Sequence, residues 1–177
     1  MSDFRVIVTG SRAYPCEDDV WEALAMAIAE HCDVGDTFTV VHGACPTGAD
    51  AAVVTWFALP DGGSGVKLVE EPHPAYWETN CLPDCHHQPR RNRAGRLYCP
   101  AAGTRRNAEM VALGADLVLA FPLEGPRARS RGTWDCVDRA RAAEIPVEIQ
   151  TPSYRPRMTL WEVADAIDAV DKAVRGE

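Results

Sequence analysis

The hydrophobic pattern of the chain changes repeatedly between short apolar runs and longer stretches with helical spacing. The apolar runs predict strands at residues 4–9, 37–41, 66–71, 115–121 and 146–149. Apolar positions that recur every three or four residues predict helices at residues 17–32, 49–59, 103–113, 133–143 and 158–175. Short strands that alternate with helices are typical of a parallel sheet with helices on both faces. We therefore expect an α/β three-layer sandwich with a mostly parallel sheet.

Length and composition favour one domain over residues 1–177, with a Cys/His/Arg-rich insertion at 78–100. The chain has 177 residues, of which 46% are hydrophobic and 25% are charged, as in ordinary globular proteins. No apolar run reaches the ~18 residues of a membrane span, and no secretory leader is visible. We expect a cytoplasmic protein without membrane association. Its formal charge of −8 argues against a general nucleic-acid coat protein but leaves room for a local basic surface.

The stretch HGACPTGAD, residues 42–50, joins a predicted strand to a predicted helix. Ligands of parallel α/β sheets bind beyond the carboxyl ends of the strands, and the N–H groups at a helix start attract anions. Gly43 and Gly48 would allow the backbone to approach a phosphate closely, and Asp50 would bind a ribose hydroxyl. In the alternative, Thr47 and Asp50 form a capping box that needs no ligand.

Other junctions of the same kind carry glycines and polar side chains. The first predicted strand ends in Gly10, Ser11 and Arg12, and Arg side chains fork onto phosphate or carboxylate groups. Arg105 and Arg106 fall in the first turn of a predicted helix, where positive charges are unfavourable because they oppose the helix dipole. This unfavourable placement indicates an anionic ligand nearby. Gly132 and Thr133 open a further helix. The residues with candidate roles in these later junctions are Arg105, Arg106, Asn107, Arg129, Arg131, Gly132 and Thr133, and Trp77 and Trp134 are candidates for stacking on a base.

The motifs VIVTGSR, VVHGACPTGAD, HPAYW, AGTRRNAEM and DLVLAFP…SRGT, taken in this order, resemble the SLOG superfamily. That group includes DNA-processing protein A and the LONELY GUY proteins, and the resemblance is to its YspA-type branch, found in bacteria and phages. It implies a Rossmann-like sheet with a nucleotide-like ligand over the strand ends. The ligand-binding residues that it implies are Gly10, Ser11, Arg12, Gly43, Gly48, Asp50, Arg106, Asn107, Gly132 and Thr133.

One position departs from the enzymatic branch of this superfamily. LONELY GUY enzymes carry a glutamate, needed for N-glycosidic cleavage, at the position that is Cys136 here. Asp135 lies one residue away and would point elsewhere on a helix. We therefore expect no phosphoribohydrolase activity. Because neither a Walker A motif nor G-x-G-x-x-G is present, we also expect no nicotinamide or flavin cofactor.

The insertion concentrates groups that bind metals. Cys81, Cys85 and Cys99 flank the neighbouring His86 and His87, and three thiolates with one imidazole are a common ligand set for structural zinc. A short segment rich in Pro and Arg has little apolar surface to fold around, so a metal would organise it. The spacing does not choose between His86 and His87. An alternative is a loop whose thiols bind nothing.

Three functional hypotheses follow from these observations. The first is a sensor or other protein that binds a nucleotide or nucleotide-derived small molecule. The second is a hydrolase of nucleotides, with Asp50, Asp135 or Glu109 as its acid or base. The third is a zinc-stabilised nucleic-acid-binding module built on the arginines at 90–96. A homo-oligomer is compatible with each.

Overall fold

The central element is a five-stranded sheet in which every neighbouring pair of strands is parallel. A computed structural model describes residues 2–59, 64–78, 81, 83 and 85–153. The strands are β1 (Asp3–Gly10), β2 (Thr37–His42), β3 (Lys67–Pro72), β6 (Leu117–Phe121) and β7 (Val147–Ile149). Their order is β3-β2-β1-β6-β7. The parallel α/β architecture expected from the sequence is therefore confirmed.

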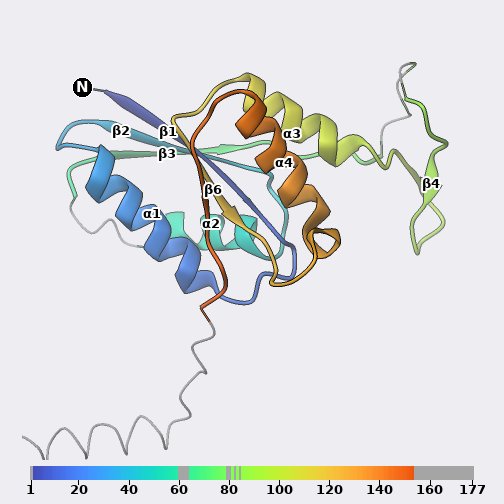
Figure 1. Ribbon diagram of the computed structural model, residues 1–177, viewed down its shortest axis with the longest axis horizontal. Helices are drawn as coiled ribbons and strands as arrows, with labels where there is room; N and C mark the ends of the chain where they lie inside the picture. Colours follow the sequence, from blue (N-terminus) through green and yellow to red (C-terminus); the bar gives the residue numbers. More distant parts are fainter. Residues whose placement is uncertain (1, 60–63, 79–80, 82, 84, 154–177) are drawn as a thin grey trace, which may run out of the picture.

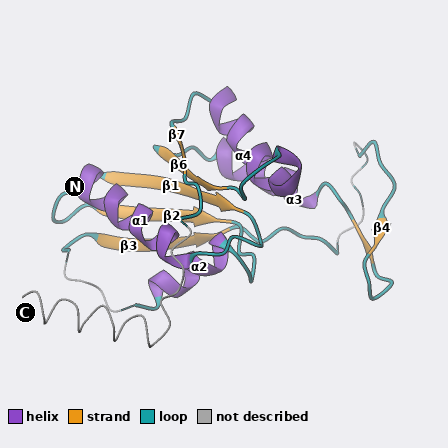
Figure 2. Cartoon of the chain, turned by 60° about the horizontal axis from the view of Figure 1, so that its bottom comes forward, coloured by secondary structure: helices purple, strands orange, loops and turns teal. Residues whose placement is uncertain are grey.

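Helices cover both faces of this sheet. They are α1 (Glu17–His31), α2 (Ala49–Phe57), α3 (Ala102–Ala112) and α4 (Arg131–Ala142), and α4 follows a short 3-10 helix, η1 (Arg127–Ser130). Figures 1 and 2 show α1 and α2 together on one face and α3 and α4 together on the other. The helix predicted at 158–175 lies outside the described residues. No described helix is long and apolar enough to cross a membrane.

The side chains of β1 explain why the sheet is covered on both sides. Val6 and Val8 pack into the cluster beneath α1 and α2, whereas Ile7 packs into the cluster beneath α3 and α4. All three are fully buried, and each such side chain stabilises the fold by about 1.5–3 kcal/mol. Because consecutive side chains of a strand point to opposite faces, a strand that is apolar at consecutive positions must be covered on both faces, as it is at the centre of a sandwich.

The strand order reverses at β1, which has β2 on one side and β6 on the other. The connections that leave β1 and β6 at their carboxyl ends therefore diverge to opposite faces of the sheet. Such a reversal opens a crevice at the carboxyl edge, where parallel α/β proteins bind ligands. The predicted site residues follow β1, β2 and β6 or lie at the starts of α3 and α4, so this crevice is where they can meet.

The insertion between β3 and α3 forms a small antiparallel hairpin. Its strands are β4 (Arg90–Arg91) and β5 (Leu97–Tyr98). Figures 1 and 2 show this hairpin projecting away from the sheet, beyond the start of α3. It is therefore displayed outside the main body, while its ends remain connected to β3 and α3.

Candidate functional site

A cavity of about 800 Å³ lies beyond the carboxyl ends of β1 and β2, with α3 and α4 forming its far wall. Nine of the ten predicted ligand-binding residues line it: Gly10, Ser11, Arg12, Gly43, Asp50, Arg106, Asn107, Gly132 and Thr133. Segments far apart in the sequence meet here because parallel strands end at the same edge of the sheet. Their roles in binding remain predictions.

Gly48 is the predicted residue that does not line this cavity. Its φ is +70° and its ψ is −144°, a conformation that is essentially restricted to glycine. A Cβ atom at this position would lie 2.0 Å from the backbone oxygen of Ser11. The close approach at Gly48 is therefore between two backbone segments, the start of α2 and the loop after β1.

The capping interpretation of Thr47 and Asp50 is wrong. The residue before α2 is Gly48, and no side chain caps this helix. Asp50 instead accepts a hydrogen bond from the backbone N–H of Cys45 at 3.0 Å. The carboxylate thus closes the loop between β2 and α2, and Asp50 lines the cavity.

Burial shapes the chemistry of Asp50. Desolvation raises the pKa of this carboxyl group, although the N–H groups of Cys45 and Gly43 and the charges of Arg106 and His42 act in the opposite direction. Asp50 is the one carboxylic residue that lines the cavity among the described residues. A buried carboxyl group with a raised pKa is a candidate for proton transfer to or from a ligand.

Arg106 supplies a cationic group to the same cavity. Its Nη1 donates to the backbone oxygen of His73 at 3.2 Å, and its Nε donates to Oδ1 of Asn107 at 3.0 Å. Asn107 is buried, and its Nδ2 donates to the Gly132 oxygen at 2.9 Å and to Asp135 at 3.0 Å. Asn107 therefore joins α3 to α4 and fixes the guanidinium of Arg106. As expected from the sequence, Asp135 does not line the cavity.

The start of α4 leaves open space at the cavity wall. A Cβ atom on Gly132 would meet no other atom within 4 Å, and the exposed side chains of Arg129 and Arg131 flank this edge. The buried hydroxyl of Thr133 has no hydrogen-bond partner among the described residues. Backbone N–H groups, two arginines and an unobstructed glycine together suit an anionic group.

The cavity lining also includes an aromatic side chain at its rim. Trp77 lines the cavity, and the guanidinium of Arg12 lies 5.2 Å from the centre of its ring, within the range of a cation–π contact. Trp134, the other aromatic candidate, does not line the cavity, and Arg127 packs on its ring instead. Of the two predicted stacking residues, the structure therefore places Trp77 at the cavity.

His42 was not among the predicted site residues, yet it is fully buried at the end of β2. The Ala44 N–H donates to its Nδ1 at 3.3 Å, so the other ring nitrogen, Nε2, carries the proton and donates to Glu70 at 3.0 Å. This ring fixes the loop that carries Gly43. A histidine directly after an apolar strand was the sequence signal for this role.

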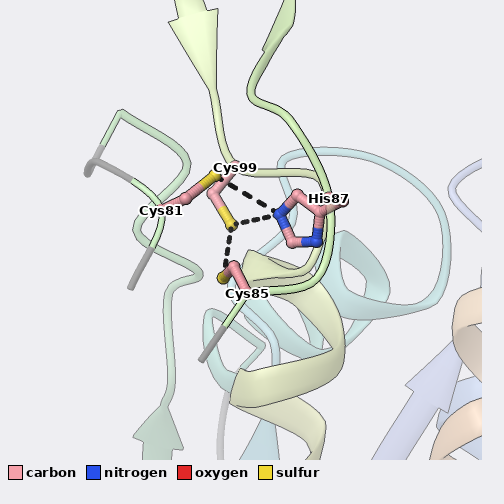
Figure 3. Close-up of side chains that lie close together, drawn as sticks. All are labelled: Cys81, Cys85, His87 and Cys99. Carbon is pink, nitrogen blue, oxygen red and sulfur yellow. Dashed lines mark hydrogen bonds between the residues drawn. The ribbon is translucent and has the colours of Figure 1, made fainter. Parts of the chain in front are cut away.

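The insertion brings four potential metal ligands together. The ligand atoms of Cys81, Cys85, His87 and Cys99 all lie within 4.8 Å of one another. Figure 3 shows Nε2 of His87 directed toward the sulfurs of Cys81 and Cys99, each at 3.3 Å. His86 is exposed and lies outside this cluster. Where the sequence left two histidines open, the structure thus selects His87 and excludes His86.

The cluster, hereafter the Cys3His cluster, favours thiolate at one position. Burial raises the pKa of Cys99, but hydrogen bonds from the Ala101 N–H, His87, Arg105 and Cys81 outweigh it and lower the pKa to about 6. Nη1 of Arg105 lies 3.2 Å from the sulfur of Cys85 and 3.4 Å from that of Cys99. Arg105 therefore serves this cluster and not the cavity.

The Cys3His cluster adjoins the cavity wall. The Cys99 N–H donates to the Trp77 oxygen at 3.2 Å, and the Ala102 N–H donates to the Cys99 oxygen at 3.1 Å. Cys99 thus connects the rim residue Trp77 to the first turn of α3. Backbone hydrogen bonds therefore link the Cys3His cluster to two segments that line the cavity.

The parallel sheet, its strand order and the cavity at its carboxyl edge define a Rossmann-like α/β protein. Residues 4–70 match the family described as "YspA, cpYpsA-related SLOG family". The Gene 61 protein of Mycobacterium phage D29 is 37% identical over 143 residues, which cover 81% of this chain and 93% of that protein. The chain belongs to the YspA, cpYpsA-related SLOG family.

Cys136 is placed where it cannot act in the cavity. It is fully buried and packs in the cluster that contains Ile7 and Val41, and it does not line the cavity. Burial raises its pKa to about 11. The Cys136 thiol therefore belongs to the packing between the sheet and α4 and is not presented to the cavity.

Proposed function

We propose that this protein binds a nucleotide or nucleotide-derived small molecule in the cavity and acts as a ligand sensor. The observation that carries the proposal is the convergence of Arg106 and the open start of α4 on one cavity at the carboxyl edge. Family membership supports a nucleotide-related ligand. Trp77 would lie against the base, and Asp50 would accept a hydrogen bond from a ribose hydroxyl.

The charge distribution supports a phosphate-bearing ligand. Four arginines line the cavity, whereas Asp50 is its one carboxylic residue in the part of the chain that the structure describes; the arginines are Arg12, Arg106, Arg129 and Arg131. This local excess of cations occurs in a chain whose formal net charge is −8. The cations would be stabilised by a ligand with one or more phosphates, whose oxygens accept forked hydrogen bonds from guanidinium groups.

Thermal unfolding with a panel of adenine and guanine mono-, di- and cyclic nucleotides tests this proposal. A ligand at ~100 times its dissociation constant should stabilise the protein by ~2.7 kcal/mol. Arg106→Ala should weaken nucleotide binding by about 1.5–3 kcal/mol, because a charge-assisted hydrogen bond is lost, and should therefore remove most of this stabilisation at the same ligand concentration. Arg141→Ala removes an exposed arginine that does not line the cavity and should respond as wild type. If no nucleotide moves the wild-type midpoint, the proposal fails.

A nucleotide hydrolase is the second candidate, and Asp50 is the observation that favours it. Its raised pKa and its position in the cavity suit a proton donor or acceptor. Asp135 and Glu109, the other acids considered from the sequence, do not line the cavity. We expect no release of free base from nucleoside monophosphates. Turnover that Asp50→Asn abolishes would establish the hydrolase in place of the sensor.

We also infer that the Cys3His cluster holds a structural zinc ion. Three sulfurs and one imidazole nitrogen match a common tetrahedral ligand set of zinc. The four thiol and imidazole groups come from both ends of the hairpin, so one ion would join its two ends. A reducing compartment such as the cytoplasm would keep the thiols available to the metal.

A further inference from the structure

The hairpin formed by β4 and β5 carries a concentrated positive charge. Residues 88–98 contain Arg90, Arg91, Arg93 and Arg96 and no acidic residue, whereas the whole chain has a formal net charge of −8. All four arginines are exposed, and none lines the cavity. This surface, hereafter the arginine hairpin, is therefore separate from the proposed nucleotide site.

The backbone of the arginine hairpin is held in a defined shape. Oδ1 of Asn92 accepts hydrogen bonds from the N–H groups of Ala94 and Arg96 at 2.9 and 3.0 Å. Nη1 of Arg91 donates to the Gly95 oxygen at 2.7 Å, which closes the turn from one side. Binding to this surface would therefore order arginine side chains and not the backbone, which limits its entropic cost.

Internal ion pairs use little of this charge. Arg96 pairs with Glu78 at 3.2 Å, but both side chains are at least 70% exposed, and such pairs contribute little to stability. Arg90 and Arg93 take part in no ion pair with any residue that the structure describes. Within the described part of the chain, these two exposed guanidinium groups are therefore not neutralised by a carboxylate.

We propose that the arginine hairpin binds the phosphate backbone of nucleic acid without sequence preference. Several cations along an exposed hairpin match a polymer with regularly spaced charges better than they match one small molecule. Guanidinium groups bind phosphate oxygens in forked geometry. The proposal goes beyond the sensor function, because it concerns a different surface and a polymeric partner.

Two features of the hairpin define the kind of nucleic-acid contact. Tyr98 is half-buried and makes an edge-to-face contact with Trp77, with ring centres 6.3 Å apart, so part of its ring is already covered. Leu97 is the one large exposed apolar side chain of the hairpin strands, which is too little for the apolar centre of a typical protein interface. With base stacking and an apolar protein interface both poorly supported, the hairpin is best suited to contacts with phosphates. Phosphate contacts carry no sequence information.

The acidic body of the protein does not prevent such binding. Electrostatic interactions between exposed charges are screened over about 8 Å at physiological ionic strength. The arginine hairpin projects away from the sheet in both views (Figures 1 and 2). A nucleic acid that contacts the hairpin tip would therefore experience the local positive charge more strongly than the net negative charge.

Fluorescence anisotropy with a labelled duplex oligonucleotide, measured over a range of salt concentrations, tests this proposal. Wild-type protein should bind with an affinity that falls steeply with salt. The double variant Arg90→Ala/Arg93→Ala should bind more weakly to every sequence and have a log–log salt slope smaller by about 1.8, because each phosphate contact contributes ~0.9. Lys67→Ala/Arg141→Ala, which removes two exposed cations elsewhere, should bind as wild type.

Competition and folding controls complete the test. Unlabelled DNA should displace the labelled duplex, whereas adenosine monophosphate and polyglutamate should not. Zinc content and melting midpoint should be equal in both double variants, which shows that the hairpin remains folded. The proposal is overturned if wild-type protein does not bind, if the two double variants bind equally, or if either competitor displaces DNA. Displacement by polyglutamate would indicate an acidic protein partner instead.

Discussion

Arg106 occupies the space that a side chain at residue 43 would fill. A Cβ atom on Gly43 would lie 1.5 Å from Nη1 of Arg106 and 2.3 Å from its Cζ. The obstacle is the flexible end of an arginine, so Gly43→Ala can be accommodated by moving the guanidinium out of its place. We expect Gly43→Ala to fold with a midpoint close to that of wild type and to bind nucleotides more weakly, by up to about 1.5–3 kcal/mol.

Isothermal calorimetry with the best nucleotide of the panel measures this effect. Gly43→Ala and Arg106→Ala disturb the same guanidinium group. The double variant should therefore bind the nucleotide with about the affinity of whichever single variant binds less tightly. Additive losses in the double variant would show that Gly43 contributes to binding independently of Arg106.

Gly48 should respond differently, because its neighbours are backbone atoms. Its φ of +70° and the 2.0 Å approach to the Ser11 oxygen leave no room for a side chain. We expect Gly48→Ala to lower the free energy of unfolding by about 1–3 kcal/mol from backbone strain alone. The steric contact with the Ser11 oxygen adds to this loss. Chemical denaturation without ligand gives this value. A wild-type midpoint would contradict the packing of the loop after β1 against α2.

The raised pKa of Asp50 predicts a pH dependence of stability. An unfolded aspartate titrates near ~3.9, whereas burial keeps the native carboxyl group protonated to a higher pH. The native state therefore binds more protons in this window, and the free energy of unfolding decreases as pH rises through it. Asp50→Asn removes this decrease and keeps an oxygen that can accept from Cys45. Its stability relative to wild type should be greater at about pH 7 than at about pH 4.

Unfolding of both proteins in denaturant at the two pH values checks the sign. Arg106 and His42 face Asp50 and favour its charged form, so they reduce the effect without reversing it. A variant that loses stability relative to wild type as pH rises would show that the native carboxylate is stabilised by its partners more than it is destabilised by burial.

The neighbouring histidines of the insertion provide a matched pair for the metal site. His87 belongs to the Cys3His cluster and His86 is exposed outside it. We expect about one zinc per chain in wild type and in His86→Ala, and a large loss of zinc in His87→Ala. Elemental analysis of protein purified without chelator measures this. Equal zinc in the two variants, or none in wild type, would refute the site.

Local pattern predicted most of the elements and the general position of the cavity. The apolar runs of β1 and β6 are visible in the sequence because both faces of these strands are buried. The residues at the strand ends then follow from the rule that parallel strands end at one edge. Helix ends are predicted less accurately: the helix expected at 49–59 ends at Phe57 in the structure. Such differences of one or two residues are usual at helix ends.

The parts that the sequence could not predict depend on contacts between distant segments. A glycine is required at residue 48 because the Ser11 backbone lies where a side chain would be. The role of Asn107 depends on its hydrogen bonds to Gly132 and Asp135 in another helix. A first-turn arginine indicated an anion, yet Arg105 contacts thiols of the insertion and Arg106 lines the cavity. Periodicity and composition carry no information about such pairs.

Gly132 offers the most direct test of the nucleotide-binding proposal. A Cβ atom there meets no protein atom within 4 Å, and alanine favours a helix over glycine by about 0.5–1 kcal/mol. Gly132→Ala should therefore have a ligand-free melting midpoint equal to or above that of wild type. If a phosphate approaches the start of α4, the added methyl group must obstruct it. The measurement is the nucleotide-dependent shift in melting midpoint of Gly132→Ala beside wild type: we predict that the shift is lost or strongly reduced, and an unchanged shift would contradict the proposal.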